Sequence, residues 1–362
     1  MQHDPCSDPS GTLTWGYRYA AAPSNPPIST AGVAIAPLPN GRVVALQNTQ
    51  WYAGEGDTGY TPETAVLWLS ADDGMVLATK QIEETFGTWA SDLAAAPNGN
   101  TYVATGDTTR AFTSAPAAAW STTGNDYLLM RRVILDPTGP ALYTYEDADS
   151  TDFQPILHRL DPASGALVWE LKSAALPDEP AAVRLFGGEV RVVAGDGSIF
   201  RVDATSGSAL GSIAQPGAAA RPSAHAAVVD ANGVTYVVMS EVPVVGGQPT
   251  NAYVYAEDAA GALLWSTLLS SSFADFHENL TIALAGSTVL VGMDEHILRV
   301  DPASGAVTPW VDVPTGGASG DVHVRSIAFD GTCGVYVTGD QGTDCDQRWM
   351  TGCSMLGLRI RL

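Results

Sequence analysis

Two stretches far apart in the chain, Leu160-Asp-Pro-Ala-Ser-Gly165-Ala-Leu-Val-Trp169 and Val300-Asp-Pro-Ala-Ser-Gly305-Ala-Val-Thr-Pro-Trp310, are nearly the same phrase. Weaker copies begin at Val202, Glu257 and Ser70, and each follows a short run in which apolar residues alternate. Such a phrase predicts a β-hairpin, because the Asp side chain caps the turn and the Gly adopts a positive φ. Val and Leu alternate on both sides of it, which favours strands over a helix.

A second pattern, an apolar run, a short Gly, Pro or Asp turn and a β-branched run, precedes the first and occurs seven times along the chain. Its copies begin at Val33, Leu93, Val133, Val183, Ala227, Ile282 and Ile327. Their spacing is typical of four-stranded propeller blades. The sequence therefore predicts an all-β fold, a single seven-bladed β-propeller domain of four-stranded antiparallel blades over residues 1–362. The expected blades are 29–86, 87–126, 127–177, 178–216, 217–270, 271–316, and 317–362 together with 11–19.

The last blade lacks a fourth strand of its own, because the chain stops after the third predicted strand, Met355–Leu362. The segment Gly11-Thr-Leu-Thr-Trp15 matches Gly165–Trp169 in register. We therefore expect the N-terminal strand to complete the last blade, which removes the open sheet edge between the two chain ends.

Four cysteines lie near the chain ends, and none belongs to a Cys-x-x-Cys pair, so they fit a zinc site poorly. They suit two disulfides in an oxidising compartment. From their places in the last blade we expect Cys6–Cys333 to clasp the ring closure and Cys345–Cys353 to staple one loop. The alternative that pairs Cys6 with Cys345 would connect opposite faces.

Composition narrows the function classes. Among 362 residues, 17 Lys and Arg stand against 39 Asp and Glu, a formal net charge of −22. A chain so poor in basic residues is not expected to bind nucleic acid or an anionic membrane surface. No apolar run reaches the length of a transmembrane segment. Residues 1–6 resemble a mature N-terminus, so a secreted, periplasmic or cell-surface protein is expected, with a lipid anchor at Cys6 left open.

The repeated phrase resembles that of the pyrroloquinoline-quinone (PQQ)-type propellers, the quinoprotein alcohol dehydrogenase-like superfamily. The residues that carry the resemblance are Asp161, Gly165, Trp169, Gly261, Trp265, Asp301, Gly305, Gly11 and Trp15. The resemblance implies that each Trp docks between neighbouring blades. The quinoprotein dehydrogenases have eight blades and an adjacent Cys-Cys pair, and this chain has neither, so dehydrogenase activity and a quinone cofactor are not expected. The non-catalytic relatives, which act as binding scaffolds, are the better analogue.

Metal chemistry has two candidate places. His225, His277 and His323 directly precede or begin three successive inner strands, so they should surround the mouth of the central channel. Such histidines suit a transition metal or acid–base chemistry, and a solvated channel lining is the alternative. The second place is the acidic loop with Asp147, Asp149 and Asp152, which could hold calcium or simply be solvated. No other cofactor is expected, and no catalytic motif is present.

Long connections should crowd one face of the ring: 48–64, 106–126, 147–154, 240–251 and 339–354. They contain aromatic side chains suited to protein or glycan contact: Trp51, Tyr52, Tyr60, Trp120 and Trp349. The sequence therefore favours a propeller that binds a protein or glycan partner through this face. The alternatives are a metal-dependent enzyme or metalloprotein at the channel mouth and a structural subunit of an extracellular assembly.

Overall fold

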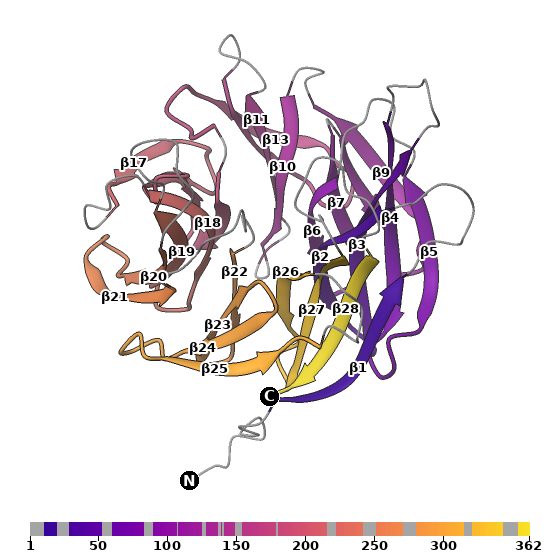
Figure 1. The fold of residues 1–362 in the computed structure, drawn as a ribbon. Coiled ribbons are helices and arrows are strands. Elements are labelled where there is room, and N and C mark those ends of the chain that lie inside the picture. Colours follow the sequence, from indigo (N-terminus) through magenta and orange to yellow (C-terminus); the bar gives the residue numbers. More distant parts are fainter. Residues whose placement is uncertain are drawn as a thin grey trace.

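The computed structural model describes residues 11–19, 29–52, 60–82, 90–106, 108–124, 128–136, 139, 141–148, 154–178, 180–215, 222–241, 251–270, 280–314, 321–342 and 354–362. These residues form seven four-stranded antiparallel sheets and contain no helix. Figure 1 shows the sheets arranged around a central axis. The predicted seven-bladed β-propeller is confirmed.

Each blade runs from an inner strand at the axis to an outer strand, in chain order. Blade one contains β2 (Ser29–Leu38), β3 (Arg42–Tyr52), β4 (Tyr60–Ser70) and β5 (Val76–Ile82). Blade two contains β6 (Ala90–Ala95), β7 (Thr101–Thr105), β8 (Thr108–Phe112) and β9 (Ala118–Thr123). Blade three contains β10 (Leu128–Leu135), β11 (Leu142–Ala148), β12 (Ile156–Leu160) and β13 (Leu167–Lys172). Blade four contains β14 (Ala182–Phe186), β15 (Glu189–Val193), β16 (Ile199–Asp203) and β17 (Ala209–Ile213).

The remaining three blades follow the same order, except at the end of the chain. Blade five contains β18 (Pro222–Val229), β19 (Thr235–Glu241), β20 (Ala252–Glu257) and β21 (Leu263–Ser270). Blade six contains β22 (Leu280–Ala285), β23 (Thr288–Met293), β24 (His296–Val300) and β25 (Val307–Asp312). Blade seven contains β26 (Asp321–Phe329), β27 (Gly334–Gly342), β28 (Ser354–Arg361) and β1 (Thr12–Tyr19).

The ring closes through the N-terminal strand, as the sequence predicts. Strand β1 pairs antiparallel with β28 from Thr12↔Arg361 to Tyr19↔Met355. In Figure 1 the indigo β1 lies along the yellow β28. The first described strand is therefore the outer strand of the last blade.

The repeated Asp phrase forms the turn between the third and fourth strands of a blade. In blade six, Asp301 Oδ1 accepts hydrogen bonds from the backbone N–H groups of Ala303 and Ser304 at 2.9 and 2.8 Å. Gly305, which ends the turn, has a φ of 70°. The turn chemistry expected from the sequence is therefore present, and its aspartates stabilise backbone turns.

Tryptophans fasten most blades to the next one. Trp120 of blade two donates from Nε1 to the Pro162 carbonyl of blade three at 3.0 Å. Its ring also lies on Gly165, where an added Cβ would come within 2.6 Å of it. The other indoles that lie on a glycine of the next blade are Trp169 on Gly207, Trp265 on Gly305, Trp310 on Gly11 and Trp15 on Gly74. This is the docking that the family resemblance implies.

Two seams are built differently. Between blades one and two, Trp68 of β4 packs edge-on against Phe112 with ring centroids 5.8 Å apart. Between blades four and five, Ile213 takes the place of the indole against Gly261. The buried Arg191 there donates to the carbonyls of Gly233 and Ala259, both at 3.3 Å.

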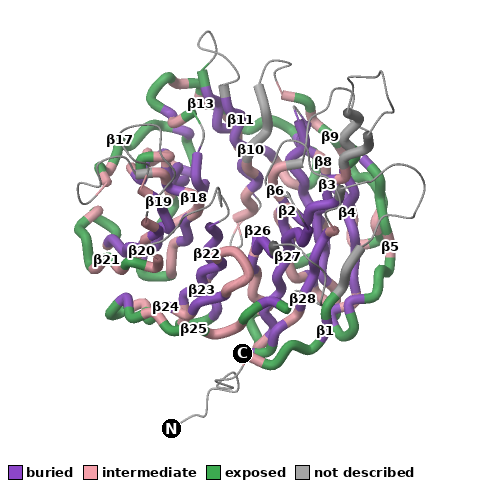
Figure 2. The backbone as a smooth tube through the Cα atoms, viewed as in Figure 1, coloured by how far each residue is buried: buried purple, intermediate pink, exposed green. Residues whose placement is uncertain are grey.

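Burial follows the ring. Figure 2 shows buried residues concentrated on the inner strands and exposed ones on the outer strands. The apolar core consists of separate clusters, most of which join the facing sheets of two neighbouring blades. Among the described residues, no helix is long and apolar enough to cross a membrane.

One expectation about the connections is wrong. Residues 106–126 do not form a long loop, because they contain β8 and β9, the two outer strands of blade two. These strands lack the Asp phrase and are rich in Thr and Ala, so their pattern is weak.

Candidate functional site

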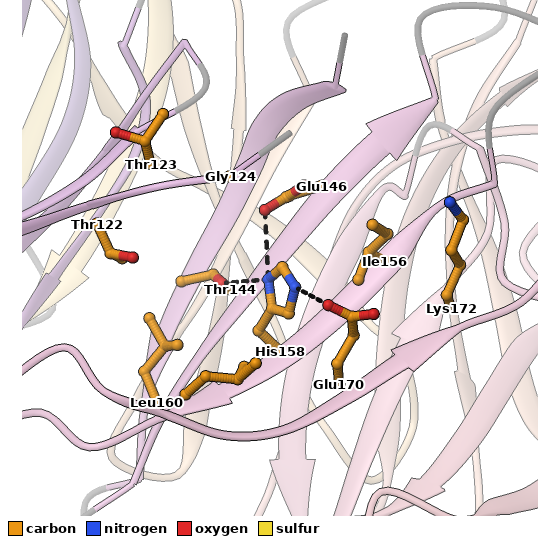
Figure 3. A pocket seen from close by; sticks show the side chains of 11 residues that line it. Thr122, Thr123, Gly124, Thr144, Glu146, Ile156, His158, Leu160, Glu170 and Lys172 are labelled. Carbon is orange, nitrogen blue, oxygen red and sulfur yellow. Dashed lines mark hydrogen bonds and ion pairs between the residues drawn. The ribbon is translucent and has the colours of Figure 1, made fainter. Parts of the chain in front are cut away.

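A polar cavity of about 440 Å³ lies in the seam between blades two and three. Its floor is the face of blade three that turns toward blade two, and its wall is the end of β9 (Figure 3). The lining residues are Thr122, Thr123, Gly124, Thr144, Glu146, Ile156, His158, Leu160, Leu167, Glu170 and Lys172. The volume is within the range of small-molecule and side-chain pockets.

His158 lies at the centre of this cavity, between two carboxylates. Its Nδ1 is 3.3 Å from Glu146 Oε1, and its Nε2 is 3.1 Å from Glu170 Oε2. Figure 3 shows the imidazole between the two carboxylates. The Thr144 hydroxyl lies 3.5 Å from Nδ1. Both ring nitrogens therefore face oxygen atoms, so the ring joins β11 to β13 across β12.

Strand geometry places these side chains on one face. Thr144 pairs with His158, and His158 pairs with Glu170, so the three residues lie in one row across the sheet. Glu146 follows Thr144 at the two-residue interval that returns a side chain to the same face. Its side chain is 1% exposed, and it lies so close to β9 that a Cβ on Gly124 would be 2.1 Å from Oε1.

A second cavity, of about 520 Å³, lies on the other side of blade two. It is bordered by Lys80, Gln81 and Ile82 of β5 and by residues 110–112 and 118–121 of blade two. Arg110 lies at the strand position that His158 occupies in blade three, since both residues precede the end of the third strand by two. Cavities therefore flank blade two on both sides.

The predicted channel-mouth histidines have partners within their own blades. His225 Nε2 is 2.8 Å from the Ser240 hydroxyl in blade five. In blade seven the buried His323 places Nδ1 3.1 Å from Asp340 Oδ1. Arg325 donates from Nε to Asp340 Oδ2 at 2.7 Å, which balances the buried carboxylate. His277 lies outside the described residues.

The channel side of blades two to four carries a charged group of three residues. Asp92 Oδ2 accepts from the Val133 N–H at 3.1 Å, across to the next inner strand. Arg132 reaches one blade further and donates to the carbonyls of Pro180 and Ala181. Burial raises the pKa of Asp92, and the nearby Arg132 and Arg184 oppose that rise. These contacts connect three successive inner strands.

The described residues contain no group of three or more His, Cys, Asp or Glu side chains arranged to hold a metal ion. Of the acidic loop, Asp147 is buried at the end of β11, whereas Asp149 and Asp152 lie outside the described residues. The metal sites at the histidines and at this loop stay predictions.

The structure describes four of the five aromatic residues predicted to bind a partner, and these four lie in two places. Tyr52 pairs with Tyr60, and Trp51 precedes Tyr52, so these three residues gather at one end of the β3–β4 hairpin. Trp120 lies in β9, and its half-buried indole donates to the next blade, as described above. Trp349 lies outside the described residues.

Cys333 is disulfide-bonded, in the turn between β26 and β27. Its carbonyl accepts a hydrogen bond from the Leu362 N–H at 2.9 Å, beside the ring closure. Cys6, Cys345 and Cys353 lie outside the described residues, so the predicted pairing stays a prediction.

Sequence reasoning missed the blade-three cavity. The sequence does not reveal it, because alternation along Leu157–Leu160 shows which face of the sheet the His158 side chain takes but not what covers that face. The available signal was the His itself, at a strand position where the repeats of blades four and six have Phe200 and Leu298.

The comparisons with known proteins agree with this architecture. A family model described as outer membrane protein assembly factor BamB, built on PQQ-type repeats, matches residues 150–343, more than half of the chain. No curated protein matches the chain. The matched region spans blades four to six and parts of blades three and seven, and so contains both residues of two of the five Trp–Gly seams, Trp169–Gly207 and Trp265–Gly305. With this match over more than half of its length and its seven four-stranded blades, the chain belongs to the BamB-like family of repeat propellers.

Proposed function

We propose that this protein is a scaffold that binds a protein partner outside the cytoplasm, with a glycan as the alternative ligand. Membership of a family described by an outer membrane protein assembly factor supports a place in the periplasm or at the cell surface. The proposed binding face is the end of the ring where the second and third strands of each blade are connected.

One observation carries the proposal. Strands β3 and β4 have 11 residues each, whereas the corresponding β15 and β16 have 5 each. The longer hairpin ends in Trp51, Tyr52 and Tyr60, which the register places together. Trp and Tyr are the residue types that most often anchor protein interfaces.

Photo-crosslinking in the producing cells tests this proposal. Benzoylphenylalanine is placed at Trp51 or Tyr60, and at the exposed Ala163 and Asn98 in the turns of the opposite face as controls. We expect one discrete protein adduct from the hairpin positions and none from the controls. A carbohydrate adduct would identify the glycan alternative. If the hairpin positions give no more adduct than Ala163, the proposed binding face is wrong.

A second candidate function, a structural subunit of an extracellular assembly, is favoured by a different observation. Among the described residues, every exposed large apolar side chain lies on an outer strand or just before one: Leu13, Met75, Val76, Leu77, Leu167, Val168, Leu210, Leu263, Leu264 and Leu268. Each outer strand ends its sheet, so one edge has no strand partner within the blade. Such edges can pair with another chain.

Size in solution separates the two candidates. Light scattering over a wide concentration range should show oligomers for an assembly subunit. The variant Leu263→Lys/Leu264→Lys should then be smaller, since charge on an edge strand opposes pairing. A strict monomer at high concentration contradicts the assembly candidate and leaves the scaffold proposal standing.

A further inference from the structure

The combination of Glu146, His158 and Glu170 at the centre of the blade-three cavity occurs in no other blade. The strand registers define the equivalent positions in the other six blades. The positions equivalent to His158 hold Leu67, Arg110, Phe200, Tyr255, Leu298 and Leu358. Those equivalent to Glu146 hold Gln47, Thr105, Ala194, Met239, Met293 and Gly339. Those equivalent to Glu170 hold Thr79, Ser121, Ser212, Ser266, Pro309 and Gly16. No other blade has an acid at any of the three positions.

In two other seams this sheet face packs against the preceding blade. Leu358 of blade seven belongs to an apolar cluster with Leu290 and Ile297 of blade six. Phe200 of blade four packs on the cluster that includes Tyr145 and Leu157 of blade three. These two blades fold with apolar side chains at the position of His158, so the repeat itself does not require Glu146, His158 and Glu170 in blade three.

Because Glu146 is buried and His158 is largely buried, their presence is expected to lower the stability of the fold unless they have a further role. Glu146 is 1% exposed and His158 is 12% exposed, although an open cavity lies beside them. Removing a carboxylate from water is unfavourable unless a partner stabilises the charge. Polar residues kept in a stable scaffold at such a cost are typical of binding sites.

The charges of the cavity indicate the ligand class. Apart from His158, the lining carries the carboxylates of Glu146 and Glu170 and the ammonium of Lys172, so carboxylates outnumber ammonium groups two to one. This excess favours a cationic ligand over an anionic one. The imidazole already presents two nitrogen atoms in one plane to the two carboxylates, which is the geometry that a planar guanidinium offers. Ile156, Leu160 and Leu167 provide apolar contact for an aliphatic stem.

We propose that the cavity between blades two and three binds the guanidinium group of an arginine side chain from a protein partner, with Glu146 and Glu170 as its acceptors. The identity of the partner as a protein rests on the proposed function. The guanidinium site itself rests on the cavity and on the three residues that only this blade has.

Two small probes test the site without any partner. Nα-acetyl-L-arginine amide carries the guanidinium, and Nα-acetyl-L-citrulline amide is its neutral isostere. Titrations followed by NMR should show saturable binding of the arginine probe and shifts of the His158 ring signals. The citrulline probe should bind at least about tenfold more weakly, because charge-assisted hydrogen bonds are lost.

A matched pair of variants separates the cavity from the general negative charge of the protein. Glu146→Thr/His158→Leu/Glu170→Ser installs residues found at these positions in other blades. Glu295→Gln/His296→Leu/Asp312→Asn removes the same chemical groups from an exposed row of blade six, where His296 is 43% exposed. We expect the first variant to lose binding by about tenfold or more and the second to bind as the original protein does.

The melting temperature provides the second readout. The blade-three variant should melt at the same temperature as the original protein or higher, because the repeat does not require Glu146, His158 or Glu170. Three outcomes would each overturn the guanidinium site. The two probes could bind equally well, both variants could lose binding equally, or the blade-three variant could melt at a lower temperature than the original protein. If the guanidinium site fails but the crosslinks from the β3–β4 hairpin are found, the proposed function stands. If only the crosslinks are absent, the proposed function fails and the guanidinium site stands.

Discussion

Glu257 is a buried carboxylic acid at a place where other repeats have an apolar residue. It stands directly before Asp258, as Leu160 and Val202 stand before their aspartates. Its side chain is fully buried, and neither carboxylate oxygen has a hydrogen-bond partner within the described structure. Burial raises the pKa of Glu257 to about 7, and the neighbouring Arg191 opposes this rise. Arg191 is itself held by carbonyls of blade five, so the four–five seam contains a buried ionisable pair.

The first prediction concerns pH. In the unfolded chain a Glu releases its proton near pH 4.5, whereas folded Glu257 keeps it to about pH 7. The folded state therefore binds more protons in this interval, and the stabilisation present below about pH 4.5 is lost as the pH rises through about 7. Between pH 5 and pH 8, the free energy of unfolding measured with urea should fall by on the order of 1–2 kcal/mol less for Glu257→Gln than for the original protein. Equal pH dependence in both proteins would contradict the assignment.

Residue identity alone did not reveal the chemistry of these positions. Asp161 and Asp301 could be interpreted from the sequence because an Asp turn is local, and the structure confirms both turns. Glu257 and His158 could not. Glu257 lies near Arg191 of the neighbouring blade, and the partners of His158 lie on two other strands of its own blade. What surrounds an inward side chain depends on how two sheets meet, and no short window of sequence contains that information.

At the scale of elements, the Trp–Gly contact is the recurring joint of the ring. Gly207 has a φ of 74°, and an added Cβ would lie 2.8 Å from the ring of Trp169. Gly187, in the other turn of the same blade, has a φ of 59° and nothing within 4 Å of such a Cβ. The two glycines share a backbone conformation, and only one of them supports an indole.

The second prediction uses this pair. Gly187→Ala should lower the free energy of unfolding by about 1 kcal/mol, the cost of a Cβ in the left-handed region. Gly207→Ala should lower it by about 2–4 kcal/mol, because the indole must also move. Urea unfolding followed by Trp fluorescence measures both. If the two variants are equally stable, the indole does not fasten blade three to blade four.

The elements that the sequence predicted well are those that carry their own pattern. The seven inner hairpins and the strand β1 each show alternation or a turn phrase, and the structure confirms them. Strands β8 and β9 were missed because their Thr- and Ala-rich segments lack both. The omission affects the site, since β9 forms the wall of the blade-three cavity.

For the whole molecule, the ring closure is the most consequential contact. Blade seven is assembled from both ends of the chain, and Trp15 of β1 donates to the Ala71 carbonyl of blade one at 2.8 Å. One short strand therefore completes a sheet and fastens a seam. The disulfide at Cys333 lies in the same blade, in the turn beside Leu362.

The third prediction assigns that disulfide. Peptide mapping by mass spectrometry without reduction should join Cys333 to Cys6. Cys6→Ser should then lower the free energy of unfolding by about 2–5 kcal/mol, since the bond restricts a loop of more than 300 residues in the unfolded chain. Cys345→Ser/Cys353→Ser is the control, and its smaller loop predicts a smaller loss. A mapped link from Cys333 to Cys345 or Cys353 shows the pairing to be wrong.

The pairing of β1 with β28 also sets the order of events during synthesis. Of the described strands, β1 is synthesised first and its partner β28 is synthesised last. Six blades can therefore form while β1 has no neighbouring strand, and contacts of such sequence separation form slowly. Unpaired strands are prone to aggregation during that interval. Folding of this protein should consequently benefit from chaperones that protect β1 until β28 has been synthesised.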